Sequence, residues 1–310
     1  MSHLFGPVPS RRLGLSLGVD LVVPKTCTFD CLYCEVGRTT DLTQERRPYR
    51  VAEIIQELQD YLENPPGALD YVTMAGSGEP TLNLGLRAII AAVKNLTTTP
   101  VALLTNGSLF HLPEVRAAVA DADVILPSLD AGREKTFQRI NRPHPGISLD
   151  LVVAGLKALR REFAGQIWLE ILVLKGINDQ PEELTAIKGL LREISPDKVQ
   201  LNTAVRPVAH KSAEALTQEE MEAVADFLGA GAEVVAAARR LSPERLEVKD
   251  RDLIDMLARR PMTAGDLAQA LGFPLAQVRQ RLGRLSKSGL VRRDVHQDQD
   301  FYRSLVTSTP

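Results

Sequence analysis

The feature that most constrains the fold is a regular alternation of short apolar runs with amphipathic helical patterns. Each run is almost continuously apolar, which is typical of parallel strands buried on both faces. Six such βα units predict an α/β protein with a parallel sheet, two units short of a complete eight-unit barrel. The predicted strands span 18–23, 70–74, 101–104, 123–127, 167–174 and 198–201, and the predicted helices span 51–62, 84–94, 112–120, 149–163, 182–193 and 218–228.

Polar or glycine-rich segments follow all six predicted strands. In parallel α/β folds, functional side chains gather in the loops after the carboxyl ends of the strands. Strand ends also favour Gly, Asn and Pro in any protein, so their composition alone does not identify a site. The candidate residues in these loops are Cys27, Cys31, Cys34, Gly76, Ser77, Gly78, Glu79, Pro80, Asn106, Ser128 and Asn202.

The three cysteines of the chain lie within eight residues, in the pattern C-x3-C-x2-C. Three thiolates can hold three irons of a [4Fe–4S] cluster and leave the fourth iron open to a small molecule. A disulfide framework would favour an even number of cysteines. A structural zinc ion would need a fourth ligand, and His3 and His144 lie well outside the motif. Free buried cysteines remain an alternative.

The cysteine spacing, with Tyr33 directly before the third cysteine, resembles the radical S-adenosylmethionine (SAM) enzymes. The segment 76–80 resembles their glycine-glycine-glutamate-proline motif, with Ser77 in place of the second glycine. The resemblance implies a partial (β/α)6 barrel, a cluster held by Cys27, Cys31 and Cys34, and SAM chelated to the open iron. It also implies backbone carbonyls of 76–80 on the SAM ammonium and Tyr33 on the adenine.

Each of these residues also has a plainer interpretation. The glycines of 76–80 allow close approach of the main chain to a ligand, but Gly and Pro also form ordinary turns. Tyr33 is alternatively a packed aromatic residue. Asn106, Ser128 and Asn202 are candidates for hydrogen bonds to the SAM ribose or carboxylate, or for caps at strand ends.

Residues 5–20 and 128–144 resemble the radical SAM branch related to the tRNA wyosine-base synthases. Those enzymes carry additional cysteines for a second cluster, and this chain has no cysteine left to form one. The relationship therefore implies the fold, SAM and an RNA-like substrate, but not wyosine chemistry. Paired Arg11 and Arg12 suit carboxylate or phosphate recognition, with a solvated basic turn as the alternative.

The last part of the chain has a different pattern. We predict a partial barrel over 1–228, a linker over 229–249 and a small α+β domain over 250–310. Thr263 and Asp266 form a predicted capping box, and residues 274–288 form a helix with one apolar stripe. Three helices followed by a hairpin resemble a winged helix-turn-helix. This domain is a candidate for binding tRNA or DNA, or alternatively a protein-docking or dimerisation module.

Composition limits the cellular context. The chain has 310 residues and a net charge of −2, and it holds no apolar run of ~18 residues. The first residues lack a signal-peptide pattern, so we expect a cytoplasmic, oxygen-sensitive protein.

The sequence thus predicts an enzyme that reductively cleaves SAM and abstracts a hydrogen atom, through a 5′-deoxyadenosyl radical, from an unidentified substrate such as tRNA or another macromolecule. The expected electron donor is a flavodoxin or ferredoxin. The alternative is a nucleic-acid-binding regulator that senses SAM or the cluster.

Overall fold

The computed structural model describes residues 2–65, 67–229, 231–235, 250–296 and 298–306. Its largest element is an eight-stranded sheet in the order β1-β2-β5-β6-β7-β8-β9-β10. The pair β1–β2 is antiparallel, and each following pair is parallel. The strands are β1 (Leu4–Ser10), β2 (Gly14–Asp20), β5 (Tyr71–Ala75), β6 (Val101–Thr105), β7 (Val124–Pro127), β8 (Gln166–Val173), β9 (Lys198–Thr203) and β10 (Ala232–Val234).

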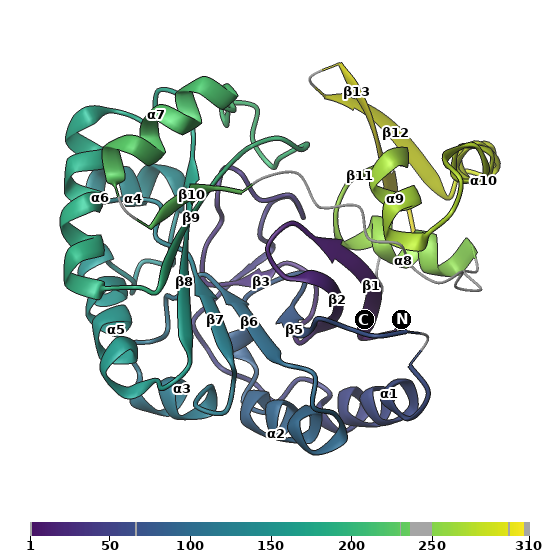
Figure 1. The fold of residues 1–310 in the computed structure, drawn as a ribbon, viewed down its shortest axis with the longest axis horizontal. Coiled ribbons are helices and arrows are strands. Elements are labelled where there is room, and N and C mark those ends of the chain that lie inside the picture. The colour runs from purple at the N-terminus through teal and green to yellow at the C-terminus, as the bar shows by residue number, and fades with distance from the viewer. Residues whose placement is uncertain (1, 66, 230, 236–249, 297, 307–310) are drawn as a thin grey trace.

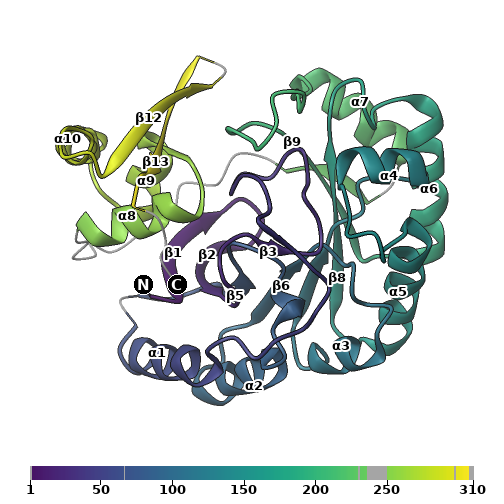
Figure 2. The ribbon, with the colours of Figure 1, turned by 180° about the vertical axis from the view of Figure 1, so that it is seen from behind.

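Helices cover the outer side of this curved sheet and leave its inner side for loops (Figures 1 and 2). Their inward faces are apolar: α2 buries Leu86, Ile89, Ile90 and Val93, the spacing of one helical stripe. The helices are α1 (Val51–Glu63), η1 (Pro80–Leu82), α2 (Leu86–Leu96), α3 (Pro113–Ala118), α4 (Glu134–Ile140), α5 (Leu149–Glu162), α6 (Pro181–Ile194) and α7 (Gln218–Leu228). The predicted α/β class with a partial barrel is confirmed.

Two strands of the main sheet were not predicted from the sequence. Gly6, Pro7 and Pro9 interrupt β1, and proline cannot donate to a central ladder, so β1 is tolerated as an edge strand. The three residues of β10 lie inside the 229–249 segment that the sequence assigns to a linker, and they pair with β9. Residues 236–249 lie outside the described residues, and the division of the chain into domains stays a prediction.

The short helix α4 also escaped prediction, and a distant carboxylate holds its first turn. Glu183 of α6 is completely buried. It accepts hydrogen bonds from the N–H of Gly132 at 2.6 Å, from Arg133 Nε at 2.7 Å and from Thr136 Oγ1 at 2.7 Å. Because these donors surround the start of α4, the helix depends on a residue about 50 positions away in the sequence.

The C-terminal residues form the predicted winged helix, which we call the tail domain (residues 250–306 as described). Its elements are α8 (Asp250–Arg259), β11 (Met262–Thr263), α9 (Ala264–Leu271), α10 (Leu275–Lys287), β12 (Val291–His296) and β13 (Gln299–Ser304). The capping box of Thr263 and Asp266 is present. The strands form one sheet in the order β11-β13-β12.

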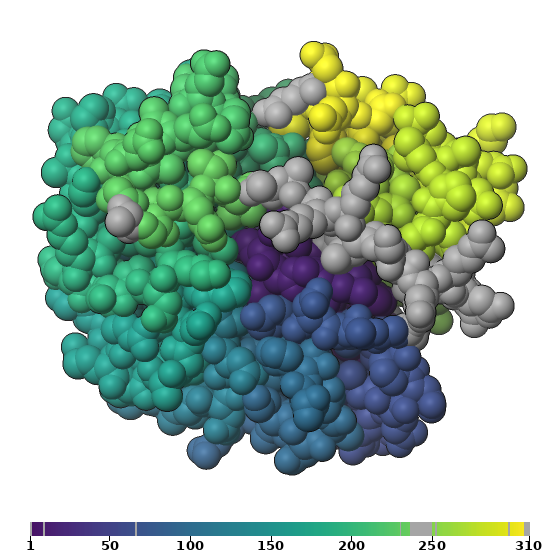
Figure 3. Space-filling model, in the orientation of Figure 1, coloured from purple at the N-terminus to yellow at the C-terminus, as the bar shows by residue number. Residues whose placement is uncertain are grey.

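The tail domain packs against β1 at the edge of the barrel sheet (Figures 1 and 3). Val8 of β1 is buried in the apolar core of the tail domain, and Phe5 packs beside it. The guanidinium of Arg259 lies 4.8 Å from the centre of the Phe5 ring and donates to the carbonyl of Ser2 at 2.6 Å. The exposed edge of the sheet is therefore covered by the tail domain. Among the described residues, none of the helices is long and apolar enough to cross a membrane.

We predict that Glu183→Ala lowers the free energy of unfolding by about 3 kcal/mol or more, because it leaves several buried donors of the α4 region unpaired. Urea denaturation of the two proteins measures this difference. Glu182→Ala is the matched control, since Glu182 lies next to Glu183 on α6 but is exposed. An equal loss of stability in both variants would contradict the role given to Glu183.

Candidate active site

Cys27 is the last residue of β3 (Thr26–Cys27), and Cys31 and Cys34 lie in the loop that leads to its paired strand, β4 (Asp41–Leu42). Main-chain hydrogen bonds attach this loop to two other parts of the barrel. The N–H of Leu32 donates to the carbonyl of Ile140 at the end of α4, at 2.9 Å, and its carbonyl accepts from the N–H of His210 at 3.0 Å. The loop is therefore held in place by protein contacts alone, at the mouth of the barrel.

All three thiols are free and half-buried. Asn106 Nδ2 lies 3.6 Å from Cys27 Sγ, and Asn141 Nδ2 lies 3.6 Å from Cys31 Sγ. Such N–H groups stabilise sulfur that carries negative charge. Burial raises the pKa of Cys27 to about 12 and raises the pKa of Cys31 well above its usual value. A coordinated metal removes the thiol proton outright, so binding iron would offset this cost.

No group of three His, Cys, Asp or Glu side chains within the described ranges is arranged to hold a single metal ion. A single zinc ion requires its ligands to converge on one point. A cluster differs, because each cysteine of a [4Fe–4S] site binds its own iron.

The loop after β5 is shaped by contacts that only glycine allows. Gly76 has a φ of +127°, and an added Cβ would lie 2.2 Å from Asp20 Oδ1. At Gly78 an added Cβ would lie 2.0 Å from the carbonyl oxygen of Thr26, next to Cys27. Ser77 donates to the Asp20 carboxylate from its N–H at 3.1 Å and from its hydroxyl at 2.5 Å. The loop is thus packed directly between β2 and the start of the cysteine loop.

Glu79 is buried, and its carboxylate is fully engaged in hydrogen bonds that connect neighbouring loops. It accepts from Thr81 Oγ1 and Thr105 Oγ1, both at 2.6 Å, and from the N–H of Asn106 at 2.8 Å. Burial raises its pKa, and these hydrogen bonds act in the opposite direction. Asn106 in turn donates to Thr28 Oγ1 at 2.7 Å. Glu79 and Asn106 therefore join the loops after β5 and β6 to the cysteine loop, and Pro80 starts η1.

Tyr33 and Asp130 form a second buried contact beside the cysteines. The Tyr33 hydroxyl donates to Asp130, which also accepts from Asn141 Nδ2 at 2.7 Å and from the N–H of Leu172 at 2.8 Å. Burial raises the pKa of Asp130 to about 6 against these hydrogen bonds. These hydrogen bonds fix the position of the Tyr33 ring beside the cysteines.

A cavity of about 260 Å³ opens beside Cys34 inside the barrel. It brings together three of the predicted residues from different loops, namely Tyr33, Ser128 and Asn202. Asn202 Nδ2 donates to Glu170 Oε1 at 3.3 Å, so its amide is already engaged with the barrel wall. The other lining residues are Ser10, Arg11, Arg12, Glu35, Asp130, Glu170, Leu172, Arg206 and Arg260.

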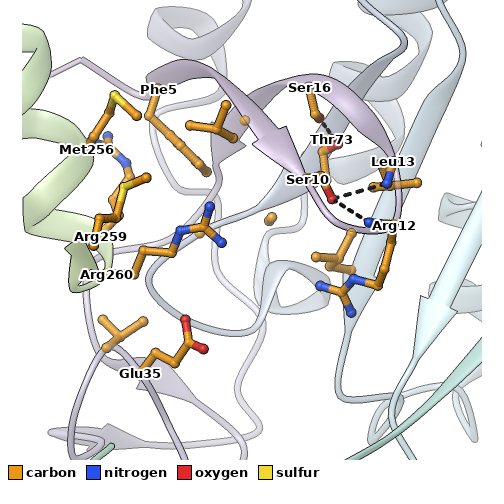
Figure 4. A pocket seen from close by; sticks show the side chains of 17 residues that line it. Phe5, Ser10, Arg12, Leu13, Ser16, Glu35, Thr73, Met256, Arg259 and Arg260 are labelled. Atoms are coloured by element: carbon orange, nitrogen blue, oxygen red, sulfur yellow. Dashed lines mark hydrogen bonds between the residues drawn. The ribbon is translucent and has the colours of Figure 1, made fainter. Parts of the chain in front are cut away.

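A second cavity, of about 200 Å³, adjoins the first and shares Ser10, Arg12, Glu35 and Arg260 with it. It reaches Gly76 at one end and Met256 and Arg259 of α8 at the other. Figure 4 shows this cavity with Arg260 extending from the tail domain and Arg12 lying in the hairpin between β1 and β2. The cysteine loop and the glycine loop therefore border adjoining cavities.

Most of the predicted site residues fall into two groups. The first group lines the two adjoining cavities and consists of Tyr33, Cys34, Gly76, Ser128 and Asn202. Ser77, Glu79, Pro80 and Asn106 are used in hydrogen bonds or packing that shape the loops. Sequence reasoning placed Arg206 in the loop after the sixth predicted strand, but it missed the cavity residues Glu35, Glu170 and Arg260. Only adjacency to a motif could have indicated Glu35, because it follows the third cysteine directly.

We predict that Asp130→Asn changes the pH dependence of stability. The pKa of Asp130 in the folded chain is about 6, above its reference value of 3.8, so folding favours the protonated form. Its contribution is complete below pH 4 and is lost as the pH rises through 6. The wild type should therefore gain up to about 3 kcal/mol relative to Asp130→Asn between pH 7 and pH 4. Urea melts across this range measure the difference, and parallel pH profiles would contradict it.

Comparison with known proteins agrees with this geometry. Residues 21–186 match the family model of the radical SAM superfamily, and residues 251–294 match a helix-turn-helix domain. The chain is 40% identical over 298 residues to a protein named GTPase Obg of Brachyspira hyodysenteriae, covering 94% of this chain and 44% of that one. It is 36% identical over 215 residues to a UPF0026 protein of Methanocaldococcus jannaschii, covering 68% and 66%.

The fold also resembles a solved radical SAM methyltransferase from Sphaerobacter thermophilus. The TM-score is 0.53 at 18% identity, over 71% of this chain and 66% of that chain. This likeness concerns the fold alone. The match to the family model, in contrast, covers more than half of the 310 residues. The chain therefore belongs to the radical SAM superfamily, whose members use a [4Fe–4S] cluster and SAM.

Proposed function

We propose that Cys27, Cys31 and Cys34 hold the [4Fe–4S] cluster and that the enzyme abstracts a hydrogen atom from a substrate in the adjoining cavity. The observation that carries the proposal is the loop of three free, half-buried thiols beside a cavity lined by polar side chains. When reduced, the bound cluster supplies the electron that cleaves SAM to methionine and a 5′-deoxyadenosyl radical. An external donor such as a flavodoxin or ferredoxin is the proposed source of that electron.

The residues around the thiols have supporting roles in this proposal. Asn106 and Asn141 direct N–H groups toward Cys27 and Cys31 and so favour the thiolate form. Burial lowers the pKa of Lys25, whose ammonium acts electrostatically on Cys34 and Cys27. These groups would offset part of the negative charge of a three-thiolate site.

The SAM site is proposed along the loops that reach the same cavities. Main-chain carbonyls of 76–80 would hold its ammonium group. Gly76 and Gly78 pack this loop closely against Asp20 and Thr26, where an added Cβ would clash. Tyr33 and Ser128 lie at the cavity wall, where an adenosyl group would contact them. Asn106 is placed as a support for the loop instead, because its amide already bonds to Thr28 and faces Cys27.

A second role, nucleic-acid binding, is proposed for the tail domain because of its helix-turn-helix match. Most of the basic side chains of α10 and β12, the candidates for phosphate contacts, are already paired. Arg281 and Arg284 lie 3.8 and 3.7 Å from Asp250 carboxylate oxygens, and Arg293 pairs with Asp300 at 2.8 Å. Arg292 pairs with Asp294 at 2.9 Å. Exposed Arg279 and Lys287 of α10 therefore carry this proposal.

The tail domain is thus proposed to present a macromolecular substrate such as tRNA, and the cytoplasm stays the predicted location. A regulator or sensor without catalysis is not favoured, because the chain belongs to an enzyme superfamily.

We predict that anaerobically reconstituted protein binds about four irons per chain and cleaves SAM when reduced. Any of the substitutions Cys27→Ala, Cys31→Ala or Cys34→Ala should abolish the cluster, because each thiolate is the sole protein ligand of one iron. Iron analysis, the visible absorption spectrum and the yield of 5′-deoxyadenosine are the measurements.

Tyr33→Phe is the control, because it removes a hydroxyl next to the cysteines without removing a cluster ligand. It should retain the iron. A triple cysteine variant that keeps the brown chromophore would refute the assignment.

We predict that full-length protein binds tRNA or duplex DNA with an affinity that falls as salt rises. The double variant Arg279→Gln, Lys287→Gln should reduce the slope of log affinity against log salt by roughly 1 per lost contact. Filter binding over a range of KCl concentrations measures the slope. Arg293→Gln should have a smaller effect, because Asp300 already pairs with that side chain. Absence of binding at low salt would assign the tail domain to another role.

A further inference from the structure

Four arginine side chains line the cavity beside Cys34, together with only three carboxylates, those of Glu35, Asp130 and Glu170. Two of the arginines have a carboxylate partner. Arg12 forms an ion pair with Glu170, and Arg206 Nη1 lies 3.2 Å from Glu35 Oε2. Asp130 is occupied by Tyr33, Asn141 and the main chain, so it neutralises none of the arginines through direct contact.

The other two arginines, Arg11 and Arg260, lack a carboxylate of their own. Arg11 Nη2 donates to the neutral amide oxygen of Asn202 at 3.1 Å. The guanidinium of Arg260 has no hydrogen bond or ion pair with any residue that the structure describes, and it extends into the cavity (Figure 4). The cavity therefore has an excess of positive charge on its two least-compensated side chains.

The charges around Glu35 support this conclusion. Arg206, Arg260 and Arg11 all attract its carboxylate. The single Glu35 carboxylate therefore interacts with three arginine side chains. Burial, with the charge of Arg206, lowers the pKa of Arg260 to about 10. An added anion would relieve both the desolvation and the mutual repulsion of these guanidinium groups.

Arg260 reaches the cavity because the tail domain is fixed to the barrel on both sides of it. On one side Arg259 Nε lies 3.7 Å from Asp20 Oδ2, and both side chains are less than 10% exposed. On the other side Asp266 of α9 lies 3.8 Å from Arg206 Nη2. The tail domain therefore supplies part of the cavity wall, and the barrel alone would lack this cation.

We propose that the cavity binds the anionic group of the substrate, a phosphate or a carboxylate, between Arg11 and Arg260, and that the tail domain thereby completes the substrate site. This inference rests on the proposed function, because it places the substrate beside the cysteine loop. Guanidinium groups suit it, since their planar set of donors matches the oxygens of either anion.

The test titrates the full-length protein with inorganic phosphate and, separately, with malonate, by isothermal calorimetry. Arg260→Gln and Arg11→Gln should each weaken binding of the preferred anion by about tenfold or more, as expected for lost charge-assisted hydrogen bonds. Arg260→Lys should recover part of the affinity, because it restores the charge but not the fork of donors. The better-bound probe identifies the phosphate or carboxylate form of the substrate.

Arg251→Gln is the matched control. Arg251 lies on the same helix, α8, but its side chain is 73% exposed and pairs with Asp255. This variant should bind the probe anions as tightly as the wild type does. A loss equal to that of Arg260→Gln would mean that binding follows the general charge of the tail domain, and it would overturn the proposal.

SAM itself carries a carboxylate, so SAM affinity and substrate-free SAM cleavage are measured on the same preparations. Arg260→Gln should weaken binding of the probe anion more than binding of SAM. If it loses SAM binding, the arginine serves SAM and the proposal of a substrate anion site fails. Undiminished anion binding by Arg260→Gln, or no binding of either probe by the wild type, would also overturn it. Because iron-free protein can be titrated, a failure of the cluster assignment is seen separately, as missing iron.

Discussion

The arrangement of the glycine loop and the tail domain around the site depends on the contacts of the Asp20 carboxylate. It stands at the end of β2, accepts two hydrogen bonds from Ser77 in the glycine loop, and pairs with Arg259 of the tail domain. Burial raises the pKa of Asp20 and lowers that of Arg259, so each side chain carries a desolvation cost. Buried pairs of this kind contribute little net stability, but losing one partner leaves the other charge uncompensated. The pair thus fixes the tail domain in one position relative to the glycine loop.

Three other buried carboxylates also connect separate segments of the chain around the mouth of the barrel. Glu79 joins the loops after β5 and β6, Asp130 joins the cysteine loop to β8, and Glu183 holds the start of α4. Each accepts several hydrogen bonds, and fully satisfied networks of this kind favour one conformation of a loop. The cysteine loop is consequently positioned by protein contacts, which would lower the ordering cost of cluster and SAM binding.

The shared cavity gives the tail domain a direct relation to the chemistry. Met256, Arg259, Arg260 and Met262 line space that extends to Gly76 in the barrel. A substrate in this space would contact both parts of the chain and would be partly shielded from water. Shielding suits a reaction that forms a reactive radical, because it limits side reactions. The tail domain contacts the barrel through Arg259 and Asp266, whereas Arg292 and Arg293 of β12 pair with carboxylates of the tail domain itself.

The sequence by itself predicted what local rules control. The spacing of the cysteines, the alternation of strands and helices and the capping box at Thr263 depend on neighbouring residues, so pattern and chemistry sufficed for them. The spacing also indicated which thiols belong together, although not how they are oriented.

The tertiary structure decided the features that depend on distant contacts. β1 contains prolines and forms only because β2 and the tail domain cover it, and α4 forms where Glu183 satisfies its first turn. The same holds for the cavity. Arg11 and Arg260 are about 250 residues apart in sequence, and packing of the tail domain on β1 brings both to one cavity. No local sequence pattern could predict that the two side chains lie close together, because their proximity depends on tertiary packing rather than on the propensities of single segments.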